Sequence, residues 1–209
     1  MATKLKLYQE ACRILRQTPV TTVTDDAFIR YELDLIYDDV LKECLEEGLW
    51  NHAMRTVAIE HSESVTPSFG YSYAFEKPSD WVRTANISAS GMMWPPLGPE
   101  GYADETTNWH ANCDPLYVSY VSDSTSFGLD LTLWPETYTR YVQHELALRI
   151  SPTVTGLNRD DKKAIKSDRD GIKRNARSKD AQNEATRSLP PGRLVTSRRG
   201  RLGLGYDYR

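Results

Sequence analysis

The sequence is poor in the residues that build disulfide frameworks and metal centres. It has only three cysteines in 209 residues, Cys12, Cys44 and Cys113. Their number and wide spacing exclude a disulfide scaffold and match no metal-ligand pattern. We expect them to be buried as small apolar side chains in a reducing compartment. The four histidines are equally scattered, at positions 52, 61, 110 and 144. We therefore predict neither a metal ion nor another cofactor.

Long apolar runs and catalytic signatures are missing as well. No run approaches the ~18 apolar residues of a membrane span, and the first residues pass into a helical pattern without a signal-peptide core. The G-x-S-x-G, H-E-x-x-H, P-loop and G-x-G-x-x-G signatures do not occur. Carboxylates are plentiful, but nothing marks two of them as sharing a cleft. We expect a protein that is not an enzyme and has no small-molecule substrate. A cell-wall hydrolase with two catalytic carboxylates is kept as an alternative.

Charge is abundant and unevenly distributed. The net charge of −3 hides two opposite parts. Residues 158–209 hold 15 basic and 7 acidic residues, a net charge of +8, whereas residues 1–157 hold 11 basic and 22 acidic residues, a net charge of −11. An acidic body followed by a basic end predicts that this end binds an anionic or acidic partner.

Apolar periodicity and end signals predict four helices, at about residues 4–16, 27–47, 134–150 and 159–185. Pro19 ends the first helix, Gly48 closes the second, and Pro135 suits the first turn of the third. The third helix has five candidates for a buried face, Tyr138, Tyr141, Val142, Leu146 and Ile150. The fourth helix has too few apolar residues to bury a continuous face, so we expect it to bridge solvent or to pack between subunits.

Residues 49–128 have a β character. Short runs at 54–60, 69–75, 82–87 and 116–121 read as strands, and alternating aromatic residues in the second run share one face. The Gly- and Pro-rich stretch 91–99 excludes regular structure. It predicts an exposed, partly apolar loop of the kind that contacts a partner.

We therefore expect an α+β fold with three parts: a helical bundle from residues 4–48 and 130–186, a β-rich insertion at 49–129, and an extended C-terminal arm at 187–209. Replacing a large core residue by Ala should cost roughly 2–5 kcal/mol. Candidates for the core of the insertion are Trp50, Phe75, Trp81 and Tyr120. Candidates for the bundle core are Leu33, Ile36, Val40, Tyr138, Val142 and Leu146.

The arm mixes arginines with a few apolar residues and shows no hydrophobic period. Alone it should be disordered, and its composition suits a segment that becomes ordered when it docks. Its arginines could also bind nucleic acid phosphates, so a DNA-binding protein is a second alternative.

The order of several short motifs adds a resemblance. A helix ending in Glu-Glu-Gly-Leu-Trp-Asn precedes the aromatic run Phe-Gly-Tyr-Ser-Tyr-Ala-Phe, which leads into Lys-Pro-Ser-Asp-Trp-Val-Arg at 77–83. Later come Leu-Tyr-Val-Ser-Tyr at 116–120 and Trp-Pro at 134–135, leading into a helix closed by Ile-Ser-Pro-Thr-Val-Thr-Gly. None of these motifs is specific singly. Their order, over about residues 7–201, resembles the tail tubular protein A family, the head-to-tail adaptors of short-tailed bacteriophages.

This resemblance implies a structural component of the virion tail, made in the host cytoplasm. Proteins of this family form a twelve-membered ring between the portal protein and the tail nozzle, and genomic DNA passes through the ring without sequence-specific binding. Their rim helps to hold tail fibres, and their C-terminal arm docks on the portal. An acidic body suits a DNA channel, because like charge lets the DNA slide. The candidate portal-binding residues are Arg193, Arg198, Arg199, Arg201, Tyr206 and Tyr208. The 91–99 loop has no place in the family pattern; its candidates for contact with the nozzle or fibres are Met92, Met93, Trp94 and Leu97.

Overall fold

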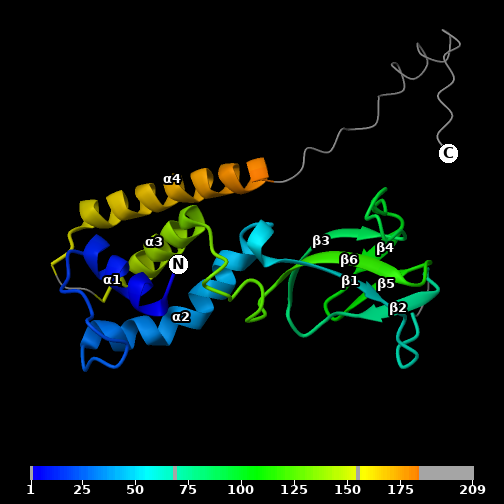
Figure 1. The fold of residues 1–209 in the computed structure, drawn as a ribbon, viewed down its shortest axis with the longest axis horizontal. Coiled ribbons are helices and arrows are strands. Elements are labelled where there is room, and N and C mark those ends of the chain that lie inside the picture. Colours follow the sequence, from blue (N-terminus) through cyan, green and yellow to red (C-terminus); the bar gives the residue numbers. More distant parts are fainter. Residues whose placement is uncertain (1, 68–69, 154–155, 184–209) are drawn as a thin grey trace, which may run out of the picture.

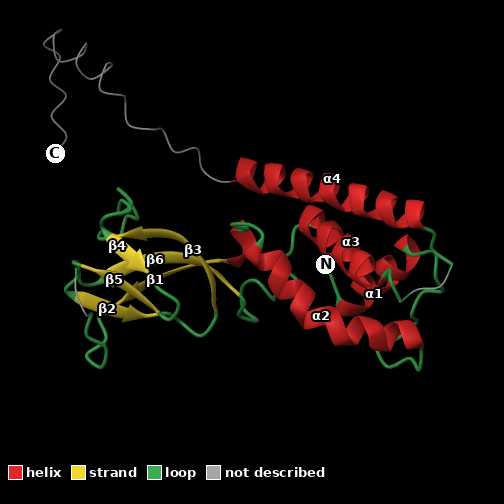
Figure 2. Cartoon of the chain, turned by 180° about the vertical axis from the view of Figure 1, so that it is seen from behind, coloured by secondary structure: helices red, strands yellow, loops and turns green. Residues whose placement is uncertain are grey.

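The computed structural model describes residues 2–67, 70–153 and 156–183. The protein has the expected α+β fold, with four helices in one lobe and antiparallel strands in a second lobe beside it (Figure 1). The two lobes follow one another along the longest axis of the molecule, and the view from behind shows the same separation (Figure 2). The predicted arm at 187–209 lies outside the described residues.

The four helices of the helical lobe are α1 (Lys4–Ile14), α2 (Phe28–Glu46), α3 (Glu136–Ile150) and α4 (Arg159–Asn183). Each predicted helix is confirmed, and the ends that fall on described residues lie within about two residues of the prediction; the predicted end of the fourth helix at 185 lies outside the described residues. Local chemistry explains this agreement. The Thr3 hydroxyl accepts the Lys6 backbone N–H at 3.2 Å and caps α1. Pro135 immediately precedes the first residue of α3.

The core of the helical lobe is built around α3, which α1, α2 and α4 all contact. The five residues predicted for its buried face are all buried. Opposite them, Leu33 and Val40 of α2 are buried, and Ile36 is partly buried against the same core. The predicted bundle core is thus confirmed.

The prediction that Trp50 lies in the core of the insertion is wrong, because this residue belongs to the core of the helical lobe. It lies just before the short helix η1 (Asn51–Ala53), and its ring turns back over the end of α2. The indole N–H donates to the Cys44 carbonyl at 2.8 Å, and the ring centre lies 4.8 Å from that of Tyr138. This site suits Trp better than a sheet surface would, because the indole N–H meets a carbonyl acceptor while the ring faces pack against other aromatic rings.

Helix α4 also departs from expectation, because it packs within the chain along α3. Its contact stripe has positions spaced four, three and four residues apart, Ile165, Arg169, Ile172 and Ala176. Arg169 stands in this stripe because its guanidinium pairs with the buried Glu145 of α3 at 2.7 Å. An ion pair thus replaces one of the apolar contacts that a helix of this composition lacks.

The β lobe has two three-stranded antiparallel sheets. The first has the order β1 (Met54–Ile59), β6 (Leu116–Ser122), β3 (Trp81–Ser88), and the second β2 (Tyr73–Glu76), β5 (Asn108–Ala111), β4 (Tyr102–Asp104). The predicted strands at 54–60, 82–87 and 116–121 are confirmed. The run 69–75 is a strand only from Tyr73 onward among the described residues, and β4 and β5 were not predicted.

The core of the β lobe is aromatic. Phe75 and Tyr120 are fully buried in it, as predicted, together with Trp109. Trp81 packs on its edge and is only partly buried, with its ring perpendicular to that of Trp109 at 6.3 Å. The cysteine prediction holds for two residues, since Cys12 and Cys44 are buried while Cys113 is intermediate.

Candidate interaction surfaces

The loop after β3 is irregular and exposed, as predicted for 91–99. It is nevertheless tied to its base by hydrogen bonds. The Leu97 N–H donates to the Ile87 carbonyl at 2.7 Å, the Ser88 hydroxyl donates to the Pro95 carbonyl at 2.9 Å, and the Asn86 amide donates to the Met93 carbonyl at 3.1 Å. These bonds hold the loop in one shape, so a partner would pay little ordering entropy to bind it.

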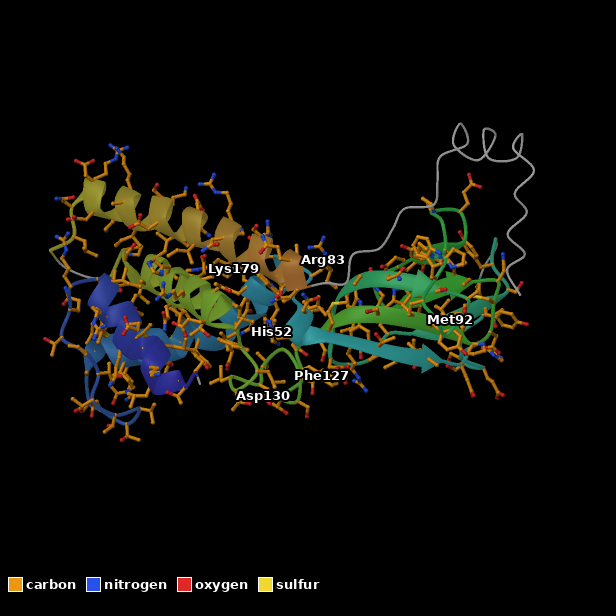
Figure 3. The ribbon with its side chains drawn as sticks, turned by 45° about the horizontal axis from the view of Figure 1, so that its top comes forward. His52, Arg83, Met92, Phe127, Asp130 and Lys179 are labelled. Carbon is orange, nitrogen blue, oxygen red and sulfur yellow. The ribbon has the colours of Figure 1, made fainter. Side chains whose placement is uncertain are left out.

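The four candidate contact residues of this loop do not share one environment. Met92 is 88% exposed and Trp94 is exposed, and Figure 3 shows Met92 on the β lobe, away from the helices. Met93 is intermediate, and Leu97 packs against the β core. Met92 and Trp94 therefore form the outward part of the predicted contact surface, while Leu97 anchors the loop.

A second apolar surface lies on α2 and was not foreseen. Phe28, Tyr31 and Leu35 are 68%, 48% and 76% exposed. Their spacing of three and four residues places them in one stripe on the outer side of the helix. The signal was present in the sequence, because these three apolar residues fall outside the helical face that contains Leu33 and Val40. We name this group the α2 stripe.

The α2 stripe lies on an acidic helix, whereas α4 is basic. Helix α2 has two basic and six acidic residues, a net charge of −4, and α4 has nine basic and five acidic residues, a net charge of +4. The two helices lie on opposite sides of the helical lobe, with α1 and α3 between them (Figures 1 and 2). The helical lobe thus has two outer faces of opposite charge.

Several cations of α4 point inward and are neutralised there. Lys173 and Arg177 both contact the Glu47 carboxylate at the end of α2. The Lys173 ammonium in particular holds the pKa of that carboxyl below its ordinary value. Lys166, Arg174 and Lys179 are exposed and have no ion pair among the described residues. These three side chains form the basic outer face of α4.

Two carboxylates of the β lobe, those of Asp80 and Glu76, are held in separate hydrogen-bond networks. The Asp80 carboxylate accepts hydrogen bonds from Ser122 at 2.5 Å, Arg55 at 2.8 Å and Tyr120 at 3.0 Å, which ties β1 and β6 to the start of β3. Burial opposes its ionisation, but these three donors outweigh that effect, so the pKa of Asp80 lies below its ordinary value. The Glu76 carboxylate accepts instead from the Ser62 and Ser64 hydroxyls, at 2.8 and 3.2 Å.

In the described part of the chain, no group of three or more His, Cys, Asp or Glu side chains is placed to hold a metal ion. No helix in residues 2–67, 70–153 and 156–183 is long and apolar enough to cross a membrane. The candidate portal-binding residues, Arg193, Arg198, Arg199, Arg201, Tyr206 and Tyr208, lie outside the described residues. Neither the models of known protein families nor the curated protein sequences give a match to this chain.

Proposed function

We propose that the chain is the structural head-to-tail adaptor of a short-tailed phage virion, forming a ring between the portal protein and the tail nozzle. The observation that carries this proposal is the pair of unlike outer faces on the helical lobe, the acidic α2 with its apolar stripe and the basic α4. Unlike faces on opposite sides of a subunit favour head-to-tail association, which closes into a ring when the rotation permits. The order of the sequence motifs supports the same function.

The charge distribution also supports passage of DNA through such a ring. Residues 1–157 have a net charge of −11. A channel surrounded by negative charge repels phosphate, so DNA would slide through it without being held. The ring number of twelve and the place in the virion tail come from the resemblance and belong to the proposal.

The two remaining contacts, with the portal protein and with the nozzle or tail fibres, are assigned to two different parts of the chain. The basic arm, with its arginines and two tyrosines, would dock on the portal protein. The outward pair Met92 and Trp94, held on a fixed loop of the β lobe, would contact the nozzle or the tail fibres. Exposed apolar side chains on a rigid loop suit such contacts because their burial contributes about 25 cal/mol per Å².

Native mass measurement of the purified chain, with and without a candidate portal protein, tests the proposal. We expect a closed ring in the presence of the portal. Leu35→Glu in the α2 stripe should prevent ring formation, and Leu133→Glu, at an exposed leucine outside α2, should not. Truncation after Ala185 should abolish portal binding. A chain that remains monomeric with the portal, or a truncated chain that binds it as well as the full chain does, would contradict the proposal.

The exposed cations of α4 favour a second candidate, a DNA-binding protein. Contacts of Lys166, Arg174 and Lys179 with phosphates would release counterions and make binding fall steeply with salt. A gel-shift titration at low salt separates the two functions, because the adaptor should give no stable shift. A shift that is lost on raising the salt would favour the DNA-binding protein.

A further inference from the structure

The α2 stripe is an apolar surface whose shape is fixed before any partner arrives. The Arg30 guanidinium lies 3.7 Å above the centre of the Tyr31 ring, and the Tyr31 hydroxyl donates to the Asp26 carboxylate at 3.1 Å. Arg30 is itself held by Asp34 at 2.7 Å. The middle residue of the stripe is thus fixed by its polar neighbours, so a partner would lose little ordering entropy in binding it.

A hollow of about 440 Å³ adjoins the stripe at Phe28. It lies between the end of α1 and the start of α2, and residues 17–21 and 25–29 line it. Val23, in the same loop, is 44% exposed. The volume falls within the ~300–1,000 Å³ of typical binding pockets. The stripe and the hollow together suit an occupant with more than one large apolar side chain.

Three carboxylates border the stripe, those of Glu32, Asp38 and Asp39. Glu32 lies one helical turn from both Phe28 and Leu35, and Asp38 and Asp39 lie one turn beyond Leu35. Asp38 and Asp39 are exposed, Glu32 is partly exposed, and none of the three forms an ion pair with a described residue. The occupant should therefore carry positive charge beside its apolar side chains, which disfavours an anionic lipid surface and a nucleic acid.

The sequence of this chain contains a segment with both properties. The basic face of α4 does not have them, because no large exposed apolar side chain of the described residues lies on that helix. Residues 187–195, which follow α4, have no carboxylate. They include three large apolar residues and two arginines, Leu189, Leu194, Val195, Arg187 and Arg193.

The length and starting point of this segment favour binding to another copy. Helix α4 ends at Asn183, on the side of the helical lobe opposite α2 (Figures 1 and 2). The 12 residues from there to Val195 reach at most about 40 Å. A neighbouring copy whose basic α4 faces this acidic α2 would bring its own segment 187–195 directly onto the stripe.

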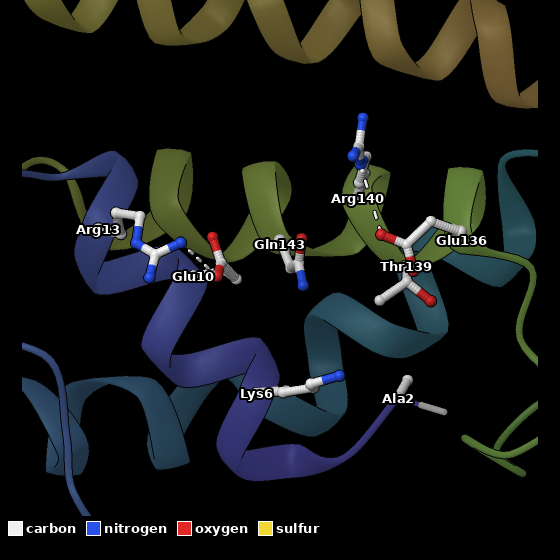
Figure 4. Close-up of a pocket in the computed structure, with 8 residues that line it drawn as sticks. All are labelled: Ala2, Lys6, Glu10, Arg13, Glu136, Thr139, Arg140 and Gln143. Atoms are coloured by element: carbon white, nitrogen blue, oxygen red, sulfur yellow. Dashed lines mark hydrogen bonds and ion pairs between the residues drawn. The ribbon is translucent and has the colours of Figure 1, made fainter.

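The polar groove between α1 and α3 is a poor alternative site for the same segment. Figure 4 shows that its Arg13 and Arg140 pair with Glu10 and Glu136, at 2.9 and 3.5 Å. Lys6 also lines the groove and leaves it with an excess of positive charge. An arginine-bearing segment would be repelled there, and the groove offers it no large apolar side chain.

We propose that the α2 stripe binds residues 187–195 of a second copy of this chain. The apolar side chains of the segment cover the stripe and enter the hollow beside it, and its two arginines pair with the bordering carboxylates. This inference deepens the adaptor function, on which its place in a ring rests. It leaves residues 196–209, with five of the six candidate portal-binding residues, free to dock on the portal protein.

The test is photo-crosslinking of the full chain with p-benzoylphenylalanine in place of Leu194. A mixture of unlabelled and ¹⁵N-labelled copies distinguishes crosslinks between copies from crosslinks within one copy. Trypsin cleaves after Arg30 and Lys42, so two residues of the stripe fall in the single peptide 31–42. We expect the main crosslink to join this peptide of one copy to position 194 of another, with a yield that rises with chain concentration.

Variants on both sides of the contact complete the test. Leu35→Glu should lower the yield of this crosslink by at least about tenfold, because it removes an apolar contact and adds a charge like those around it. Leu133→Glu, at an exposed leucine outside α2, is the matched control and should leave the yield unchanged. Arg187→Gln together with Arg193→Gln should lower the yield by roughly threefold to fivefold. This double variant leaves α2 intact, so it tests the proposal even if Leu35→Glu does not fold.

Crosslinks confined to single copies, or equal yields in Leu35→Glu and Leu133→Glu, would overturn the proposal. Native mass measurement of the ring is read separately. A ring that forms with the portal but gives no crosslink to peptide 31–42 overturns this binding site and leaves the adaptor function standing. The crosslink between copies without a ring supports the site and contradicts the adaptor function.

Discussion

The Asp180 carboxylate, near the end of α4, accepts the backbone N–H of Asn51 at 3.1 and 3.3 Å from its two oxygens. In return, the Asn51 amide donates to the Asp180 carbonyl at 2.7 Å. The two residues are 129 positions apart, and Asn51 begins the short helix that leads into β1. The reciprocal bonds join the last helix to the point where the chain leaves the helical lobe. Arg83 of β3 adds a bond to the Glu46 carbonyl close by.

The first prediction concerns this junction. Asp180→Ala removes the acceptor for the Asn51 N–H, in the manner of a lost helix cap, so we expect a loss of roughly 0.5–1.5 kcal/mol in the free energy of unfolding. Urea denaturation measures the loss. Asp168→Ala is the control, since Asp168 is an exposed aspartate of the same helix with no ion pair among the described residues. Equal stability of the two variants would count against a capping role for Asp180.

The second prediction concerns the ion pair between α3 and α4. Glu145 is buried, and Arg169 keeps 16% of its side chain exposed. Arg169→Met leaves the Glu145 carboxylate buried without its cation. Since Arg169 is not fully buried, we expect a cost of about 2–3 kcal/mol, below the ~3–5 kcal/mol for breaking a fully buried pair.

The double variant Arg169→Met with Glu145→Leu is the matched control for that experiment. It removes both charges and leaves apolar side chains in the stripe, so it should regain most of the lost stability. Thermal and urea unfolding of both variants decide the matter. If the double variant is less stable than Arg169→Met, the cost does not come from an unpaired buried carboxylate.

The third prediction is a pH dependence caused by His52. Neither ring nitrogen is accessible or hydrogen-bonded among the described residues, and the ring lies 4.4 Å from that of Tyr138. Burial lowers the pKa of His52 to about 4, from an ordinary value of 6.5. The unfolded chain therefore binds more protons than the folded chain between these two values.

The sign of this effect follows from the difference in bound protons. The contribution of His52 to stability is fully present above pH ~6.5 and is lost as the pH falls toward ~4, at a cost of roughly 1–2 kcal/mol after allowance for partial exposure. His52→Phe fits among the neighbouring rings and cannot be protonated. Urea unfolding at pH 7 and pH 4.5 should show a smaller loss for this variant than for the unmodified chain. An identical loss in both would refute the assignment.

The fourth prediction locates Trp50. Because its ring packs on Tyr138 and its indole donates to Cys44, Trp50→Ala should cost about 3–5 kcal/mol. Hydrogen exchange should accelerate first in α2 and α3. Phe75→Ala, in the separate core of the β lobe, should accelerate exchange first in β2 and β5. The same exchange pattern in both variants would mean that the lobes unfold as one unit.

Local signals predicted much of this fold. The helix ends follow from local residues such as Pro135 and from the spacing of apolar residues, all of which act within a few positions of the chain. The strands β1, β3 and β6 are long enough to show their pattern. By contrast, β4 and β5 have three and four residues, Tyr102–Asp104 and Asn108–Ala111, too few for a period to be recognised.

The candidate surfaces, like the fold, could be predicted from the sequence only in part. The sequence by itself determined the exposed loop around Met92, because Gly and Pro exclude regular structure there, and it determined the split between an acidic body and a basic end.

Tertiary structure alone decided which distant residues meet. Glu145 lies 24 positions from Arg169, and Asn51 lies 129 positions from Asp180, so no local pattern could reveal that these groups satisfy one another. Trp50 entered the helical core for the same reason, since Tyr138 became its neighbour only through the packing of α3 on α2. Burial and pairing depend on contacts between segments far apart in the chain, whereas helix ends and turns depend on the few residues beside them.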